Sequence, residues 1–484
     1  MLAKLKIPKQ QRIFVNRTLN FEDIKVVGFD MDHTLALYKR ETFEELAFVE
    51  TLKKFIAAGY PQELAQLRFK HDFVIRGLLV DRARGNVLRV DAHKYVKDAY
   101  HGYRRLSKEE RYQLYNQQSF PVEECLSIDT LFALSEVQLF VEIVEFMHQH
   151  PGAIAKSFQQ VYDDIRLYID LSHKDNSIKA KVLAHPERYL KKDKHLASSL
   201  LRQIDAGKSL FLLTNSTYAY TNQVMTWVFE GTNEGFSSWH DYWSYIITDA
   251  GKPNFFGGAA PFQGLDRSGQ VVEVTVDQLQ QGGIYQGGNA GLFETQSGFR
   301  GDEILYVGDH IYGDIIHPKG ILNWRTMLIV EELEEELPKL AKLKLELSRI
   351  YEHIHQREEL DEKLQRLRSK IGANFRQSEK AKTRGDHLKA EQLLGENAKL
   401  NEAFSGLRQE LNTLDETIKI LIDHRAKRVH PVWGELMKVG LEASRFAQQV
   451  NSYACIYSSR VSNLRYYSPF KKFLSYHENL PIDS

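Results

Sequence analysis

Cysteine is scarce in this chain: Cys125 and Cys455 are its only two, far apart in 484 residues. This argues against a disulfide framework and fits a reducing cytoplasm. Charge of one sign is not in excess either, because Lys plus Arg and Asp plus Glu both total 64. A generic nucleic-acid surface, which needs a basic face, is therefore not expected. Residues 1–16 lack the apolar run of a signal peptide, and no stretch approaches the roughly 20 apolar residues of a membrane span. We expect a cytoplasmic protein that binds neither nucleic acid nor membrane.

Short apolar runs that end in polar residues predict the strands of a parallel sheet. They occupy residues 24–29, 209–215, 245–250 and 303–309. Helical patterns separate the later runs, which is typical of a doubly wound α/β sheet. Residues 51–190 are rich in Tyr, His, Arg and Lys and contain helical stretches, so we expect a mainly helical cap domain inserted after the first strand. The catalytic core then comprises residues 1–50 and 191–335.

The composition changes to Glu, Lys, Leu and Gln from about residue 337. Apolar residues recur at steps of three and four through residues 340–375 and again through 400–421. This pattern predicts an antiparallel, coiled-coil-like helical hairpin over residues 336–430. The hairpin either packs within one subunit or supports contacts between subunits. Residues 431–484 are apolar and aromatic again and should pack on the core or at a subunit interface.

The segment FDMDHTLALY places two aspartates at the carboxyl end of the first predicted strand. Open α/β sheets carry their chemistry at this edge. We assign Asp30 as the nucleophile of a phosphoryl transfer, and Asp32 as the general acid that protonates the leaving oxygen and then activates water. The second aspartate argues against a dehalogenase reaction, because a dehalogenase has no leaving alkoxide and needs no general acid to protonate it. The alternative for such a pair is a loop or a helix cap.

Two further motifs follow later strands. Thr214 and Asn215 end the second run, where a hydroxyl or amide can donate to a phosphoryl oxygen without adding charge. Lys252 follows the third run and can neutralise both the aspartate pair and the phosphate. Thr and Asn commonly end strands, and a lone lysine is more often solvated. The order of the motifs along the chain is what supports these assignments.

A metal site is predicted from the aspartates together. Asp309 and Asp314, in YVGDHIYGD, follow the fourth run. Mg²⁺ prefers carboxylate oxygens and keeps several waters. The Asp30 carboxylate, the backbone carbonyl of Asp32 and the carboxylate of Asp309 would form the protein part of its shell, with Asp314 as support. An acidic loop without a metal is the alternative.

The motif series DxDxT, TN, K and GDxxxxD resembles the haloacid dehalogenase superfamily of phosphatases. More narrowly, the chain is similar to the cytosolic purine 5′-nucleotidases that prefer inosine and guanosine monophosphates. The similarity covers roughly residues 10–335 and reappears around YYSPF, whereas the heptad hairpin is the poorest match. It implies Mg²⁺-dependent hydrolysis of GMP or IMP, phosphotransfer to nucleosides, a nucleotide effector such as ATP or GTP, and a homodimer or homotetramer.

The resemblance also gives a base-recognition hypothesis. Arg166, Asp170 and His173 fall at i, i+4 and i+7, so they share one helix face, and Lys179 follows beyond the helix end. In the resembling family, the equivalent Arg, Asp and Lys bind the purine base and nearby groups, which would favour a 6-oxopurine over adenine. Tyr103, in HGYRR, would stack on the base. An ordinary surface ion pair is the alternative for the helix residues.

Two other functions stay open at this point. The same catalytic set could act on a sugar phosphate or another small phosphomonoester. The chain could also be a degenerate phosphatase core that serves as a nucleotide sensor or scaffold, although the intact Asp30 and Asp32 pair, Lys252 and Asp309 argue against this.

Overall fold

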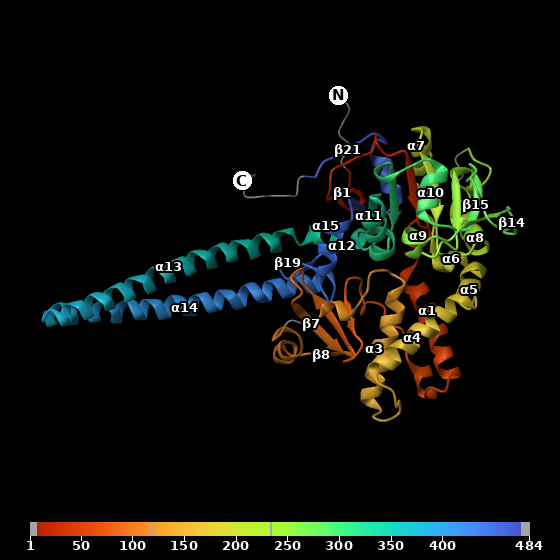
Figure 1. Ribbon diagram of the computed structural model, residues 1–484. Coiled ribbons are helices and arrows are strands. Elements are labelled where there is room, and N and C mark those ends of the chain that lie inside the picture. Colours follow the sequence, from red (N-terminus) through yellow and green to blue (C-terminus); the bar gives the residue numbers. More distant parts are fainter. Residues whose placement is uncertain (1–6, 119, 233–234, 476–484) are drawn as a thin grey trace. The chain divides into compact units, whose positions relative to one another are not determined.

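The main sheet of the protein has ten strands in a computed structural model that describes residues 7–118, 120–232 and 235–475 (Figure 1). In spatial order they are β1 (Phe14–Val15), β20 (Ile456–Ser458), β17 (Arg325–Ile329), β16 (Ile304–Gly308), β3 (Val26–Phe29), β11 (Ser209–Leu213), β12 (Tyr245–Thr248), β15 (Gly283–Gly287), β13 (Phe262–Leu265) and β14 (Val271–Glu273). Neighbours from β20 through β15 are parallel, and the pairs at the two edges are antiparallel. The prediction of an α/β protein with a large, mainly parallel sheet is confirmed.

The strand order reverses at β3. From β3 the chain builds β11, β12 and β15 on one side and then returns to add β16, β17 and β20 on the other. At such a switch point the connections leave in opposite directions, so the carboxyl ends of the strands open into a crevice. The strands that precede the predicted acids, β3 and β16, are neighbours at this point.

Both faces of the sheet are buried, which explains why its strands read as continuous apolar runs. On β3, Val27 and Phe29 belong to one hydrophobic cluster, and Val26 belongs to the other. On β11, Leu212 packs in the first cluster and Phe211 in the second. Helices between the strands cover these faces: α7 (Leu196–Asp205), α8 (Tyr218–Phe229), α9 (Asn254–Gly257), α10 (Ala290–Ser297) and α11 (His317–Leu322).

The segment between β3 and β11 contains a second sheet, which the expectation of a mainly helical cap did not include. This sheet is antiparallel and has five strands, in the order β8 (Arg104–Arg105), β7 (Val96–His101), β6 (Asn86–Val90), β5 (Leu79–Asp81) and β9 (Leu126–Ser127). The helices of the segment are α1 (Arg40–Ala57), α2 (Lys108–Arg111), α3 (Ala133–Gln149), α4 (Phe158–Lys174), α5 (Lys179–Ala184) and α6 (Pro186–Tyr189). Strand β6 is buried throughout although it contains Arg89, so no polar and apolar alternation marks it as a strand.

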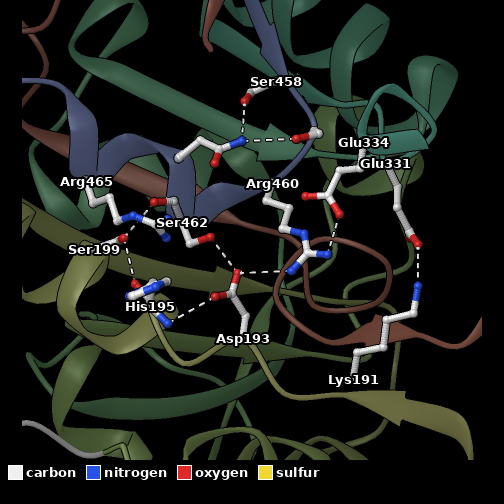
Figure 2. A network of polar contacts seen from close by, with 12 residues as sticks. Lys191, Asp193, His195, Ser199, Glu331, Glu334, Ser458, Arg460, Ser462 and Arg465 are labelled. Carbon is white, nitrogen blue, oxygen red and sulfur yellow. Dashed lines mark hydrogen bonds and ion pairs between the residues drawn. The ribbon is translucent and has the colours of Figure 1, made fainter. Parts of the chain in front are cut away.

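The C-terminal segment packs on the core. It adds β20 to the main sheet, and β21 (Lys472–Phe473) pairs with β2 (Leu19–Asn20), while α15 (Arg445–Tyr453) precedes β20. Figure 2 shows the polar network around it. Ser462 donates to Asp193, and Arg460 pairs with Asp193 and Glu334. The hydroxyl of Ser199, on α7, donates to the backbone carbonyl of Ser462.

Residues 338–435 form a separate compact unit. The helices α13 (Lys344–Thr383) and α14 (His387–Val429) run antiparallel and pack on each other. An ion pair joins them where Arg357 Nε lies 2.8 Å from Asp415 Oδ1. The sequence left open whether the hairpin packs within one subunit or between subunits. Within this chain, α13 and α14 pack on each other. Over the part of the chain that the structure describes, no helix is both long and apolar enough to span a membrane.

Candidate active site

Carboxylates from three positions meet where β3 and β16 end. Asp30 follows β3, Asp309 follows β16, and Asp314 lies in the helical turn η7 (Ile311–Ile316). One oxygen from each carboxylate lies within 4.8 Å of the other two. Oxygen ligands of this kind suit a hard divalent cation. The cluster can therefore hold a metal ion, and it joins three of the residues that the sequence predicted for that purpose.

Lys252 supplies a fixed positive charge to this cluster. Its Nζ lies 2.9 Å from Asp30 Oδ1 and 2.8 Å from Asp314 Oδ1, and it also donates to the Tyr306 hydroxyl at 2.9 Å. Burial alone lowers the pKa of a lysine, but the Asp30 and Asp314 carboxylates outweigh it and hold the pKa of Lys252 well above its usual value. The ammonium group thus stays charged beside Asp30.

Burial raises the pKa of Asp30 to about 7, opposed by Lys252 and reinforced by the Asp314 and Asp32 carboxylates. A divalent cation among these carboxylates would favour their ionised forms, because it adds positive charge where the negative charges repel each other. The donor set and its crowding therefore fit a bound cation.

Asp32 lies in a different polar environment from Asp30. Its Oδ1 accepts a hydrogen bond from the Tyr38 hydroxyl at 2.7 Å, and its Oδ2 accepts one from the Ser216 hydroxyl at 2.9 Å. The Tyr38 hydroxyl also lies 2.9 Å from that of Tyr220. Burial raises the pKa of Asp32, against the hydrogen bonds from Tyr38 and Ser216. A buried carboxyl with a raised pKa is suited to carry and release a proton.

Asn215 connects the end of β11 to the loop that carries the lysine. Its side-chain amide donates to the Lys252 carbonyl at 3.0 Å, and its Oδ1 accepts from the Lys252 backbone N–H at 2.7 Å. The Thr214 hydroxyl accepts from the Ser216 backbone N–H at 3.1 Å. These contacts give Asn215 a positioning function for Lys252, whereas donation to a phosphoryl oxygen by either residue stays a prediction.

A cavity of about 510 Å³ opens beside the acids, within the roughly 300–1,000 Å³ typical of small-molecule sites. It is lined by Asp30, Asp32, Tyr38, Phe43, Thr130, Phe132, Ala133, Glu136, Arg166, Ile169, Asp170, His173, Ile178, Lys179, Thr214, Asn215, Ser216, Tyr220, Lys252, Pro253, Asp309, His310, Gly313 and Asp314. The cavity thus brings together the predicted catalytic residues and four of the five predicted substrate residues.

Tyr103 is the exception, and its prediction as a base-stacking residue has no geometric support. Its hydroxyl donates to Glu142 and accepts from Gln138, while the Lys70 ammonium lies 3.3 Å from its ring centroid. The aromatic rings that line the cavity are instead those of Tyr38, Phe43, Phe132 and Tyr220. The only clue in the sequence was the preceding pair His101-Gly102, and this pair does not reveal which strand carries Tyr103 or which way its side chain points.

Glu136 is a cavity residue that the sequence reasoning missed. It lies on α3 with a side chain only 2% exposed, and Arg166 Nη1 lies 2.8 Å from its Oε2. Arg166 Nη2 also lies 3.3 Å from Asp170 Oδ1. A glutamate within the apolar stretch FALSEVQLFVEIVEFM was the available signal, because an acid on a buried helix face needs a partner.

Comparison with known proteins identifies the family of the chain. The model of the 5′ nucleotidase family matches residues 13–484. The chain is also 28% identical over 463 residues to a 5′-nucleotidase domain-containing protein of Dictyostelium discoideum, covering 94% of this chain and 72% of that protein. The chain belongs to the 5′-nucleotidase family. It is an enzyme, a hydrolase of the 5′-nucleotidase type.

Proposed function

We propose that this enzyme hydrolyses purine nucleoside 5′-monophosphates, preferably GMP or IMP, in a Mg²⁺-dependent reaction through a phosphorylated Asp30. The observation that carries the proposal is the grouping of Asp30, Lys252, Asp309 and Asp314 at one end of a cavity that Arg166 also lines. This is the chemistry of the haloacid dehalogenase-like phosphatases. Mg²⁺ bound by Asp30, Asp309 and Asp314 would neutralise charge on the transferring phosphoryl group.

In the first half of the reaction, a carboxylate oxygen of Asp30 attacks phosphorus and the bond between phosphorus and the 5′-oxygen breaks. Asp32 donates its proton to that leaving oxygen, which departs as the nucleoside hydroxyl. Lys252 stabilises the negative charge of the phosphoryl oxygens from 2.9 Å beside the nucleophile. Tyr38 and Ser216 hold the Asp32 carboxyl toward the cavity.

In the second half, the Asp32 carboxylate removes a proton from water as the water oxygen attacks phosphorus. The bond between phosphorus and Asp30 then breaks, which releases inorganic phosphate and restores both carboxyl groups. A nucleoside hydroxyl in place of the water would receive the phosphoryl group instead. Phosphotransfer to nucleosides is therefore part of the proposal.

The far side of the cavity supports a purine substrate. The Arg166 guanidinium, with a side chain 58% exposed, and the Asp170 carboxylate, with a side chain 46% exposed, offer a donor and an acceptor on one helix face. The Phe132 ring provides a flat apolar wall for a base. A sugar phosphate would leave much of the 510 Å³ cavity without contacts.

The nucleophile is tested by Asp30→Asn, which keeps the shape of the side chain but cannot form the acyl phosphate. We expect phosphate release to fall by at least about 10³-fold, with an unchanged circular dichroism spectrum. Asp205→Asn, at the exposed end of α7, is the control and should keep wild-type activity. Near wild-type turnover of Asp30→Asn would refute the assignment.

The substrate class is tested by a phosphate-release screen over nucleoside monophosphates, sugar phosphates and p-nitrophenyl phosphate, with and without Mg²⁺. We expect GMP or IMP to have the highest kcat/KM and activity to disappear with EDTA. The screen is repeated with ATP or GTP, because the resemblance to the purine 5′-nucleotidases motivates a nucleotide effector. Preference for a sugar phosphate would overturn the substrate, and nucleotide binding without turnover would indicate a non-catalytic sensor.

A further inference from the structure

Arg76 is a fully buried arginine that lies directly behind the metal cluster. It precedes β5 in the inserted segment, and its side chain has no exposed surface. Its Nη1 donates to the backbone carbonyl of Asp309 at 2.7 Å. No motif in the sequence points to this residue, and the mechanism above does not use it.

The charge of Arg76 is neutralised by one carboxylate. Its Nε donates to Glu332 Oε1 at 3.0 Å and its Nη2 donates to Glu332 Oε2 at 2.6 Å. This bidentate ion pair fixes the plane of the guanidinium. Glu332 follows β17, the strand next to β16. Nη2 also donates to the Ile329 carbonyl at 3.4 Å, and Nη1 donates to the Asp309 carbonyl from this rigid support.

A second residue of the inserted segment reaches the other end of Asp309. The Thr130 hydroxyl lies 3.4 Å from Asp309 Oδ2 and also accepts from the Phe132 backbone N–H at 3.4 Å. The backbone joins these two contacts, since Gly77 N–H donates to the Ile128 carbonyl at 2.8 Å. Gly77 directly follows Arg76 and Ile128 lies two residues before Thr130, so the backbone segments that carry the two contacts are hydrogen-bonded to each other.

We propose that Arg76 and Thr130 are positioning residues for the metal site, and that through them the inserted segment sets the affinity of the Asp309 loop for a divalent cation. Arg76 fixes the peptide plane that follows Asp309, and Thr130 restrains the rotation of its carboxylate through Oδ2. Residues that orient a metal ligand commonly change metal affinity by about 10- to 100-fold when they are replaced.

This arrangement joins metal binding to substrate binding. Thr130 and Phe132 both line the cavity, the Thr130 hydroxyl contacts Asp309, and the Phe132 backbone N–H donates to that hydroxyl. A shift of this wall toward a bound substrate would move the Thr130 hydroxyl relative to the Asp309 carboxylate. The inference rests on the proposed metal site, but it does not depend on which phosphomonoester is the substrate.

The first test is Thr130→Val, which removes the hydroxyl and keeps the shape of the side chain. Mn²⁺ binding to the full-length enzyme is measured by electron paramagnetic resonance without any nucleotide. We expect the dissociation constant to rise about 3- to 10-fold, because the 3.4 Å contact is a weak one. Thr130→Ser should restore most of the affinity, and Thr226→Val, at an exposed position on α8, should bind as wild type.

The second test removes the buried ion pair as a unit. Arg76→Met alone would leave the Glu332 carboxylate buried without its bidentate partner, and this variant could unfold. The double variant Arg76→Met/Glu332→Leu avoids this, and we expect it to melt near the wild-type temperature and to bind Mn²⁺ at least 10-fold more weakly. If it does not fold, Thr130→Val decides alone. Wild-type Mn²⁺ affinity in Thr130→Val, or in a folded double variant, would overturn the inference.

These outcomes are separable from the proposed nucleotidase reaction. Weaker Mn²⁺ binding in the variants supports the positioning function even if GMP is not a substrate. Conversely, wild-type Mn²⁺ affinity together with rapid GMP hydrolysis would reject the positioning function and leave the nucleotidase proposal standing.

Discussion

Asp30 and Asp32 are separated by one residue, yet their surroundings give them different chemistry. Asp30 faces a lysine and two further carboxylates, whereas both oxygens of Asp32 accept hydrogen bonds from hydroxyl groups. Burial raises the pKa of both, so the pKa does not separate them, but only Asp30 of the two has an ammonium group beside it, at 2.9 Å, to stabilise a phosphoryl group. In the proposed reaction, the local partners rather than the residue type therefore distinguish the nucleophile from the acid.

Asp170 should contribute to selectivity but not to the chemical step. Its carboxylate lies on the cavity wall beside Arg166, on a different element from the catalytic acids. We predict that Asp170→Ala lowers kcat/KM for GMP about 10-fold or more, because a base left with an unpaired polar group binds poorly. The value for p-nitrophenyl phosphate, which has no base, should stay within about two-fold. An unchanged ratio of the two would remove Asp170 from the base site.

Glu44 should make stability depend on pH. Burial raises its pKa to about 7, opposed by Arg40 and reinforced by Glu331 and Glu332. The folded state therefore holds a proton that the unfolded state has lost, so this group's contribution is complete below pH 4.5 and is lost as the pH rises to about 7.

Glu44→Gln mimics the protonated form, so the stability of the variant relative to wild type should increase as the pH rises. From pH 4.5 to 8, we expect its free energy of unfolding relative to wild type to increase by about 3 kcal/mol, from about 1.4 kcal/mol per pKa unit. Urea denaturation at several pH values measures this difference. A difference that does not change with pH would show that Glu44 ionises normally.

At the scale of elements, the core strands could be predicted because both faces of the sheet are buried and the strands are uniformly apolar. The five-stranded sheet of the inserted segment could not. Its strand β6 buries Arg89, which donates to the carbonyls of Leu436 and Lys438, residues that lie some 350 positions away. Such a pairing depends on the tertiary fold, so no local pattern reveals it. Arg76 could not be predicted for the same reason, whereas Lys252 could, because it lies in the loop that follows β12.

Strand β3 requires a glycine where the sheet meets α10. A Cβ on Gly28 would lie 2.1 Å from Cζ of Phe211 on the neighbouring strand, which other aromatic rings hold in place. Gly28→Ala should therefore destabilise the protein by about 1–3 kcal/mol through overpacking. Gly320→Ala, on α11 with no atom within 4 Å of the new Cβ, is the matched control and should be neutral or slightly stabilising. Thermal unfolding monitored by circular dichroism compares the two, and equal melting temperatures would contradict the packing argument.

For the whole molecule, the sequence predicted a core interrupted by an insertion and followed by a helical hairpin. This outline came from the length, the apolar runs that flank residues 51–190 and the change of composition near residue 337. For the C-terminal segment, the sequence predicted packing either on the core or at a subunit interface. Its β20 pairs between β1 and β17, so the last part of the chain completes a sheet that begins near the N-terminus.

The two helices of the hairpin pack through a mainly apolar heptad stripe that also contains Arg357, Ser378 and Asn397. Half-buried or buried positions repeat every seven residues on each helix, at Ile350, Arg357, Leu364, Ile371 and Ser378 on α13 and at Ala390, Asn397, Phe404, Leu411 and Ile418 on α14. Each stripe packs on the other helix of the same chain. Large apolar side chains exposed elsewhere on the two helices, such as Leu345, Phe375, Leu388 and Ile420, are scattered along their length. We expect a hairpin of this kind to be complete within one subunit.

We therefore predict that the hairpin can be removed without loss of the active site or of any dimer or tetramer. Within the other unit, Leu436 N–H donates to Glu336 Oε2 at 2.9 Å, so the two ends that flank residues 338–435 are adjacent. A Gly-Ser linker of about six residues should bridge them. The shortened enzyme should keep kcat/KM within about three-fold and the same number of subunits by sedimentation equilibrium, because the catalytic residues and the main sheet all lie outside the deleted segment. Conversion of an oligomer to a monomer with activity retained would instead show that the hairpin carries the subunit contacts.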